Sequence, residues 1–322
     1  MRGIPKIILD RLQKLEPEAS FSGVLPKIRS SSGSLYYIKL GSPSEVEQYA
    51  GEAESLKVIC SAAPGLAPKL LAFEVLEDGV PLFISEYKDI GSLSSSAADV
   101  LARRLATELH SADSIPSSEK FGFKIATYCG ATRLSNGIFD RWDECYSAMI
   151  GDLLSQLERR GKYEKLCRKG EVVKEEVIPK LLGKYSSNIF SSVLNGRAIT
   201  GSLKVHPVVL HGDLWLAYYA LQSGNAGVDK ATGQPIIFDP ASYYGHNEAD
   251  LSIARIFGGF PQSFFDKYHE CLPKSEPVGQ YNLRMDLYEL FHYLNHTLLF
   301  GGHYGSSAEK KMDTLIRALP TL

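Results

Sequence analysis

Two short apolar segments in the second half of the chain each end in an aspartate, and this repeated arrangement narrows the possible folds more than any other feature. The first, VVLHGDLW (208–215), contains Asp213, and the second, PIIFDPASYYG (235–245), contains Asp239. Short apolar runs bounded by turn-forming residues are typical of buried strands. We therefore expect two buried strands that each present a carboxylate at the carboxyl end.

Each aspartate alone would as readily serve a turn or a helix cap, but other polar residues stand in a definite order around the pair. Alternation along the predicted strand 35–40 places Tyr36, Ile38 and Leu40 on one face and Lys39 on the other. Glu52 lies near the inward side of the next helix, and Asn225 lies between the two aspartates. Phosphoryl transfer needs a cation on the nucleotide phosphates, metal ligands and a base near the acceptor hydroxyl. The ordered set therefore predicts Lys39 held by Glu52, Asp213 as the base, and Asn225 and Asp239 as Mg²⁺ ligands.

The rest of the chain predicts a small β-rich part followed by a larger helical part. Strands are predicted at 35–40, 69–77, 80–87 and within 207–239. Helices are predicted at about 45–61, capped by Ser44 with Glu47, and at 98–110, 143–160, 174–185 (interrupted at Pro179) and along a C-terminal stripe from Leu283 to Leu298. The expected fold class is α+β with two lobes, an N-lobe over 1–90 and a C-lobe over 91–322, joined by a connector near 86–91.

The composition excludes several classes of protein. The chain has 35 basic and 37 acidic residues and a net charge of −2, which favours neither a nucleic-acid partner nor a membrane surface. No segment approaches the about 18 apolar residues that span a bilayer, and residues 1–20 predict an amphipathic helix rather than a signal peptide. The five cysteines form no CxxC pair, so we expect free, mostly buried thiols and a cytoplasmic protein.

Several motifs together resemble the fructosamine-3-kinase family, also called ketosamine or protein-ribulosamine 3-kinases. The match is most specific in FDPASYYGHNEADLSIARIFGGFPQSFFDKYH (238–269), and it covers nearly the whole chain, most weakly before residue 35 and between about 150 and 205. Matching segments in the same order are YIKL, GEAESL (51–56), KFGF (120–123), HGDLW (211–215), SGN (223–225) and LYELFHYLNH (287–296).

The resemblance implies a protein-kinase-like fold and ATP- and Mg²⁺-dependent phosphorylation of the sugar 3-hydroxyl of ketosamines. These are fructosamine or ribulosamine adducts of amines, including those on the lysines of glycated proteins, and phosphorylation makes the adduct labile in a deglycation repair. Adenine would bind the connector at Glu86, Tyr87 and Lys88. Trp215 would either line the sugar pocket or belong to the core. The preferred ketosamine and the oligomeric state are not predicted.

One departure from the family pattern bears directly on activity. The family has HGDLWSGN, whereas here LAYYALQ (216–222) separates Trp215 from Ser223, so that Asn225 follows Asp213 by twelve residues. Metal–oxygen distances of about 2.0–2.1 Å leave little freedom in this spacing. The insertion either bulges outward, or displaces Asn225, or is an artefact of the gene model. A catalytically impaired kinase-fold protein therefore stays an alternative, as does a related small-molecule kinase of the aminoglycoside or choline type.

Other expectations concern the nucleotide loop, the cysteines and the histidines. The segment FSGVLPKIRSSSGS (21–34) lacks GxGxxG, and with no cysteine before Cys60 the loop has no residue for a disulfide between subunits. His292 and His296 are spaced i, i+4 without a third ligand at characteristic spacing, so a zinc site is not predicted there. His211 is expected to brace the loop that carries Asp213 rather than to transfer a proton.

Overall fold

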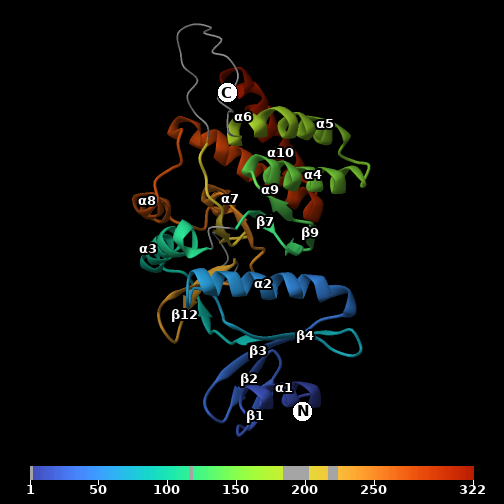
Figure 1. Cartoon of the computed structure of the whole chain (residues 1–322), viewed down its shortest axis with the longest axis vertical. Coiled ribbons are helices and arrows are strands. Elements are labelled where there is room, and N and C mark those ends of the chain that lie inside the picture. Colours follow the sequence, from blue (N-terminus) through green and yellow to red (C-terminus); the bar gives the residue numbers. More distant parts are fainter. Residues whose placement is uncertain (1–2, 116–118, 184–202, 217–223) are drawn as a thin grey trace.

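The computed structural model describes residues 3–115, 119–183, 203–216 and 224–322. The chain forms two lobes stacked along the long axis of the molecule, with helix α2 (Val46–Ala62) at their boundary (Figure 1). This is the α+β architecture of the protein-kinase-like fold that the sequence predicts.

The small lobe is built on an antiparallel five-stranded sheet in the order β1-β2-β3-β5-β4. Its strands are β1 (Phe21–Val24), β2 (Lys27–Ser30), β3 (Leu35–Leu40), β4 (Leu70–Val75) and β5 (Pro81–Glu86). The predicted hairpin turn at Asp78-Gly79 lies between β4 and β5, and Gly79 has a positive φ of 81°. The three predicted strands of this part are therefore confirmed: β3 has the predicted bounds, and β4 and β5 lie within the predicted ranges 69–77 and 80–87.

The side chains of strand β3 alternate between the two faces of the sheet. Tyr36 and Ile38 are buried against helix α1 (Lys6–Leu15), whose Ile8 and Leu12 are fully buried. Leu40 is also predicted to lie on this face, but it is 37% exposed because the strand ends there. Successive side chains of a strand point to opposite faces, so Lys39 is directed away from this core.

Helix α2 confirms the predicted helix but not its predicted cap. The capping box is formed by Ser42 and Glu45, around a single 3₁₀ turn that precedes the helix. Ser44 and Glu47 do not pair; the Glu47 carboxylate instead accepts hydrogen bonds from Arg133. The prediction was wrong by two residues because the 3₁₀ turn moves the first hydrogen-bonded turn towards the N-terminus.

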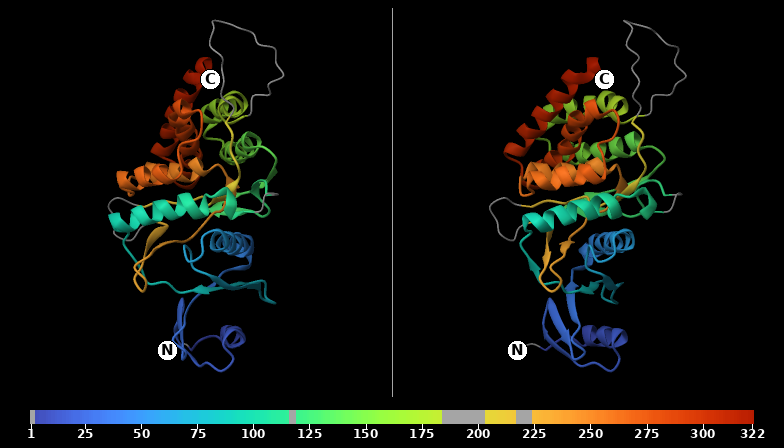
Figure 2. Two further views of the ribbon diagram at one scale, coloured as in Figure 1. Left: turned by 60° about the vertical axis from the view of Figure 1, so that its left-hand side comes forward. Right: turned by 90° about the vertical axis from the view of Figure 1, so that its left-hand side faces the viewer.

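The large lobe is mainly helical and contains short strands next to the lobe boundary (Figure 2). Its helices are α3 (Ser95–Arg104, continued by a π-helical turn to Leu109), α4 (Trp142–Glu158), α5 (Glu164–Val172), α6 (Ile178–Leu182), α7 (Asn247–Ile256), α8 (Gln262–Cys271), α9 (Tyr281–Phe300) and α10 (His303–Ala318). Within the predicted helix at 174–185, the described residues form a π-helical turn followed by α6, which starts beside Pro179, and 184–185 lie outside the described residues.

Small β-sheets of the large lobe hold the loops after β11, before β12 and after β13 at the boundary between the lobes. One has the order β10-β7-β14-β11 and another the order β13-β12-β6. Their strands are β6 (Ile90–Gly91), β7 (Phe121–Phe123), β10 (Gly137–Phe139), β11 (Val208–Leu210), β12 (Ala226–Asp229), β13 (Pro235–Ile237) and β14 (Tyr243–Gly245); β8 (Thr127–Cys129) pairs with β9 (Thr132–Leu134). The predicted β-type region at 207–239 thus corresponds to β11, β12 and β13.

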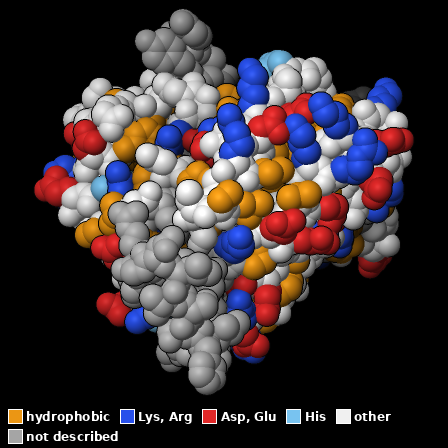
Figure 3. Space-filling model, turned by 90° about the horizontal axis from the view of Figure 1, so that it is seen from above, with side chains coloured by type: hydrophobic (Ala, Val, Ile, Leu, Met, Phe, Trp, Pro, Cys, Tyr) orange, Lys and Arg blue, Asp and Glu red, His pale blue; other side chains and the backbone are white. Residues whose placement is uncertain are grey.

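Helix α9 organises the core of the large lobe. The sequence predicts one apolar stripe, but α9 is buried around most of its circumference because α4, α7 and α10 pack against it. The cysteines are free, and three of the five are buried. Among the described helices none has the length and apolar character needed to cross a membrane. Seen from the end of the large lobe, basic and acidic side chains are interspersed (Figure 3).

Candidate active site

A cavity of about 400 Å³ at the boundary of the lobes collects the residues that the sequence predicts for phosphoryl transfer. Lys39 and Glu52 reach it from the small lobe, and Asp213, Asn225 and Asp239 reach it from the loops after β11, before β12 and after β13. They are separated by up to 200 positions in the chain. Such a convergence of polar groups in a cleft marks a candidate active site.

Lys39 forms the predicted ion pair with Glu52. The Lys39 Nζ donates to both carboxylate oxygens of Glu52, at 2.7 and 3.0 Å, and lies 3.7 Å from Oδ1 of Asp239. Burial disfavours the ammonium, but the carboxylates of Glu52 and Asp239 outweigh it and raise the pKa of Lys39. Lys39 is therefore a fixed positive charge that points across the cavity to the loop after β13.

Asp213 and Asn225 are in direct contact despite the insertion between them. The Asn225 side-chain amide donates to the Asp213 carboxylate at 3.0 Å and to the Asp213 carbonyl oxygen at 2.8 Å. Burial raises the pKa of Asp213 to about 6, while hydrogen bonds from Cys129 and Asn225 lower it. Asp213 is thus a carboxylate that becomes a competent proton acceptor just below neutral pH.

The two ends of the insertion are held together by backbone contacts. The Asn225 N–H donates to the Trp215 carbonyl at 2.9 Å, and Leu216 pairs with Gly224 in an antiparallel bridge. A Cβ on Gly224 would lie 2.4 Å from the Trp215 oxygen, so only glycine fits there. The interpretation that the insertion displaces Asn225 is therefore wrong. Whether the insertion bulges outward concerns 217–223, which lie outside the described residues.

Asp239 is held in an unusual backbone conformation that aims its side chain into the cavity. Its φ is +53°, which costs free energy for a residue other than glycine, and its side chain is 63% exposed. Because the Asn225 nitrogen donates to Asp213, the Asn225 amide oxygen is left for another partner. A carboxylate and an amide oxygen are hard ligands of the kind that Mg²⁺ prefers, so the residues present fit a magnesium ion.

His211 joins the two aspartate loops, as the sequence predicts. Its Nδ1 accepts from the backbone N–H of Asp213 at 3.2 Å, and its Nε2 donates to the Phe238 carbonyl at 2.9 Å. The ring is fully buried, which lowers its pKa. A neutral imidazole with both nitrogens engaged in this way positions backbone rather than transferring protons.

Asp250 of α7 is a positioning residue that the sequence reasoning missed. Its carboxylate accepts from the backbone N–H groups of His211 and Gly212, both at 2.8 Å, and lies 3.2 Å from Nε2 of His110. Hydrogen bonds from these groups outweigh burial and lower the pKa of Asp250. The residue lies within the family-like segment 238–269, but only the folded chain brings it under the Asp213 loop.

A second cavity, of about 260 Å³, adjoins the first and is mostly apolar. Tyr37, Leu56, Phe83 and Phe238 contribute to its walls, and the connector residues 86–88 form one side. The Glu86 and Tyr87 N–H groups already donate to the carbonyls of Lys69 and Leu35. Its shape and position suit a flat aromatic ring between the lobes.

Trp215 lines the cleft, and the segment 21–34 approaches the connector through Lys27. Trp215 is partly exposed, lines the cavity beside Asp213 and packs its ring 5.4 Å from that of Phe257. The segment 21–34 forms the β1–β2 hairpin, whose connection is only Leu25-Pro26. Lys27 of this hairpin lies with its Nζ 4.2 Å from the centre of the Tyr87 ring.

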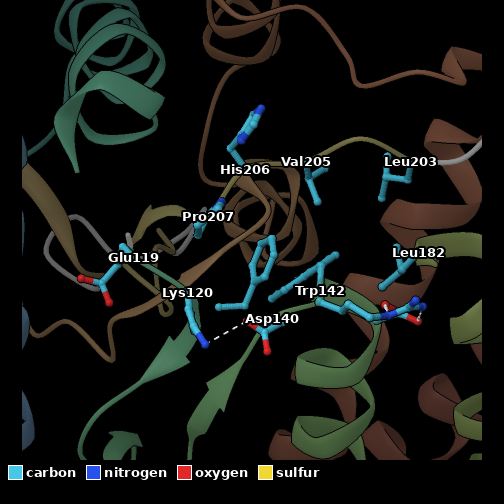
Figure 4. Close-up of a pocket in the computed structure, with 12 residues that line it drawn as sticks. Glu119, Lys120, Asp140, Trp142, Leu182, Leu203, Val205, His206 and Pro207 are labelled. Carbon is cyan, nitrogen blue, oxygen red and sulfur yellow. Dashed lines mark hydrogen bonds and ion pairs between the residues drawn. The ribbon is translucent and has the colours of Figure 1, made fainter. Parts of the chain in front are cut away.

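Another cavity, of about 350 Å³, lies in the large lobe and contains none of the predicted site residues (Figure 4). Lys120 and Asp140 form an ion pair at its edge, 2.9 Å apart, and His206, Pro207 and Trp142 form other parts of the wall. Four of its charged groups are thus paired with one another, Lys120 with Asp140 and Arg141 with Asp143, which makes it a weaker candidate for catalysis than the cleft.

The two-lobe fold, with the Lys39–Glu52 pair facing an Asp–Asn–Asp set, defines a protein of the protein-kinase-like class. A family model described as fructosamine kinase matches residues 26–318. The chain belongs to the fructosamine kinase family.

Relatives and solved structures agree with this assignment. The chain is 32% identical over 285 residues to a chloroplastic protein-ribulosamine 3-kinase of Arabidopsis thaliana, covering 88% of this chain and 77% of the relative. It is 30% identical over 300 residues to ketosamine-3-kinase of Mus musculus, covering 87% of each. In fold it is similar to a putative fructosamine-3-kinase from Thermobifida fusca, with a TM-score of 0.72, 22% identity and coverage of 96% and 98%.

Proposed function

We propose that this chain is an ATP-dependent kinase that phosphorylates the sugar 3-hydroxyl of ketosamines. The observation that carries the proposal is the contact between Asp213 and Asn225, beside Asp239 and opposite Lys39, in one cavity. Family membership and relatives named ketosamine-3-kinase and protein-ribulosamine 3-kinase support the substrate class.

Each residue has a role that follows from its surroundings. Asp213 accepts the proton of the sugar hydroxyl, because its carboxylate is buried beside the cavity and ionises near pH 6. Lys39, fixed by Glu52, contacts the phosphates of the nucleotide. Asn225 and Asp239 would hold Mg²⁺, which neutralises phosphate charge when bound.

The substrates are assigned to the two adjoining cavities. Adenine occupies the apolar cavity at Glu86, Tyr87 and Lys88, with the Glu86 carbonyl and the Lys88 N–H as partners, since the other two N–H groups of the connector donate within the sheet. The sugar occupies the polar cavity against Trp215. In this proposal residues 1–90 form the nucleotide lobe and residues 91–322 the acceptor lobe.

The biological substrates in this proposal are free ketosamines and glycated proteins, and the reaction serves deglycation repair. Trp215 and Asp239, which line the polar cavity with Asp213, are partly exposed, which is compatible with a ketosamine carried on a protein lysine. A cytoplasmic location is supported by the five free thiols.

A coupled assay of ADP release with synthetic fructosamine and ribulosamine, with and without Mg²⁺, tests the proposal. Phosphate on the sugar 3-oxygen, identified by phosphorus NMR, is the expected product, and Asp213→Asn should abolish it. Phosphorylation of choline or an aminoglycoside but of no ketosamine would support the alternative small-molecule kinase. Nucleotide binding without turnover of any of these alcohols would support a kinase-fold protein that lacks catalysis.

A further inference from the structure

The proposed base is one of three side chains whose metal-ligating atoms lie close together. Cys129 ends strand β8, Asp213 follows β11, and His292 lies in the middle of α9. The Cys129 sulfur, a carboxylate oxygen of Asp213 and a ring nitrogen of His292 all lie within 4.8 Å of one another. Three elements far apart in the sequence thus place a thiol, a carboxylate and an imidazole around one point.

The imidazole of His292 lacks the partners that buried polar groups normally have. The side chain is 4% exposed, and its Nδ1 has no hydrogen-bond partner among the described residues. An unsatisfied buried polar atom costs free energy, so the ring keeps a nitrogen that the described residues leave without a partner. Cys129 is 2% exposed, and its sulfur accepts from the Asn295 amide at 3.1 Å, which fixes the sulfur beside the carboxylate.

The three ligand types select a particular class of metal. Thiolate, imidazole and carboxylate together bind zinc, at distances of about 2.0–2.3 Å, with tetrahedral geometry that spaces ligand atoms about 3.3–3.8 Å apart. Movements of about 1 Å would bring atoms that are within 4.8 Å to this spacing. Mg²⁺, in contrast, prefers an octahedron of oxygen ligands. Zinc would therefore favour the site with Cys129 and His292, and Mg²⁺ the site with Asn225 and Asp239.

We propose that a zinc-like divalent cation binds Cys129, Asp213 and His292 and thereby inhibits phosphoryl transfer. With three protein ligands the cation would keep an open fourth position, as catalytic zinc sites do, and Asp213 is the ligand that also lines the cavity. On binding, the Cys129 thiol loses its proton to solvent and the thiolate bonds the metal. Coordination to the cation lowers the basicity of the Asp213 carboxylate, so that it no longer accepts the sugar proton; this last step rests on the proposed function.

The inhibition should leave nucleotide binding in place. Lys39, Asn225 and Asp239, which are assigned to the nucleotide and its magnesium, contribute no ligand to the proposed cation. Zinc is therefore expected to lower kcat at saturating magnesium–ATP without weakening the binding of a fluorescent ATP analogue. Because ATP itself binds zinc, free zinc must be fixed by a metal buffer, and a zinc-selective chelator should restore the rate.

Direct binding, measured without ATP, is the decisive experiment. Co²⁺ added to the full-length chain should produce the near-ultraviolet thiolate-to-cobalt charge-transfer band, and Zn²⁺ should abolish it. Cys129→Ser should remove the band, while His292→Asn and Asp213→Asn should each weaken Co²⁺ binding by about tenfold or more. Cys271→Ser and His303→Asn, both outside the cluster, are the matched controls and should retain wild-type binding.

The outcomes separate this proposal from the proposed function. No thiolate band in the wild-type chain, or a band that persists in Cys129→Ser, would overturn the metal site. Zinc inhibition that is unchanged in His292→Asn would overturn the inhibitory role of this cluster. If the chain phosphorylates no ketosamine at all, the proposed function fails, but the cobalt spectrum still decides whether the cation site exists.

Discussion

Shortening the insertion is the most informative perturbation, because the structure shows how the two flanking chain ends could be joined. Trp215 and Asn225 already share the backbone hydrogen bond that would link the first and fourth residues of a β-turn. Deleting 217–223 joins Leu216 to Gly224, which now face each other in an antiparallel bridge. The deletion restores the family spacing of five between Asp213 and Asn225 and keeps the packing of Leu216 against Gly259.

The expected change in stability follows from loop closure. Nine residues now separate Trp215 from Asn225, and two would remain. The entropy of closing a flexible loop scales with the logarithm of its length, so the shorter loop should stabilise the fold by about 1.3 kcal/mol. For a chain of this size that free energy raises Tm by about 2 °C.

The expected change in activity is small. Asn225 already donates to the Asp213 carboxylate at 3.0 Å in the presence of the insertion, so the deletion has no misplaced ligand to correct. We expect kcat and the Mg²⁺ dependence of the rate to stay within about twofold, which corresponds to a change of less than about 0.4 kcal/mol in the activation free energy.

Coupled ADP-release kinetics and thermal unfolding, on the wild-type chain and the deletion, check both expectations. Asn225→Ala in each background is the control, and it should lower the rate by the same factor in both if Asn225 works in the same place. A deletion that raises kcat more than tenfold would refute the reasoning, because it would mean that the insertion holds the site in an inactive arrangement. A loss of the same size would show that residues 217–223 take part in catalysis.

Other predictions concern single residues of the site. Because burial raises the pKa of Asp213 to about 6, kcat should fall as the pH drops through about 6, and a flat pH–rate profile between 5 and 8 argues against Asp213 as the base. For the same reason Asp213→Asn should stabilise the chain by up to about 3 kcal/mol at pH 8. This gain in stability should vanish below about pH 4. Lys39→Met should lower kcat by about 100-fold or more with the fold retained, judged by circular dichroism, and a change in ketosamine KM alone would contradict its role. Asp250→Asn leaves one amide oxygen where two carboxylate oxygens accept from two buried N–H groups, so urea unfolding should show a loss of about 1–3 kcal/mol. A loss well below about 1 kcal/mol would mean that the Asp213 loop does not depend on it. Trp215→Ala should raise the KM for ketosamine and leave the KM for ATP unchanged, and the reverse pattern would move the sugar elsewhere.

Local patterns in the sequence were sufficient to predict the elements that carry the site. Alternation identified β3 and the side of the strand on which Lys39 lies, and short apolar runs before Asp213 and Asp239 located β11 and β13. These predictions hold because strand periodicity and turn chemistry are properties of a few neighbouring residues. The cap of α2 was misplaced because Ser42 and Ser44 are both good caps, and the choice between them depends on a 3₁₀ turn.

The residues that surround the catalytic loop were not predictable in the same way. Asp250 is one acidic residue among 37 acidic residues in the chain, and its role depends on α7 lying under the backbone of His211 and Gly212. Cys129 and His292 are likewise separated from Asp213 by about 80 residues in each direction. Contacts of this kind are set by how strands and helices pack, and no local pattern records them.

The sequence by itself thus determined the fold class, the family and the identities of the residues that face the cleft, because these depend on periodicity, turn residues and motif order. The tertiary structure alone decided whether a seven-residue insertion separates Asp213 from Asn225. It keeps them together because a backbone hydrogen bond and a β-bridge close the loop at its base, and the length of a loop closed in this way has little effect on the positions of its ends.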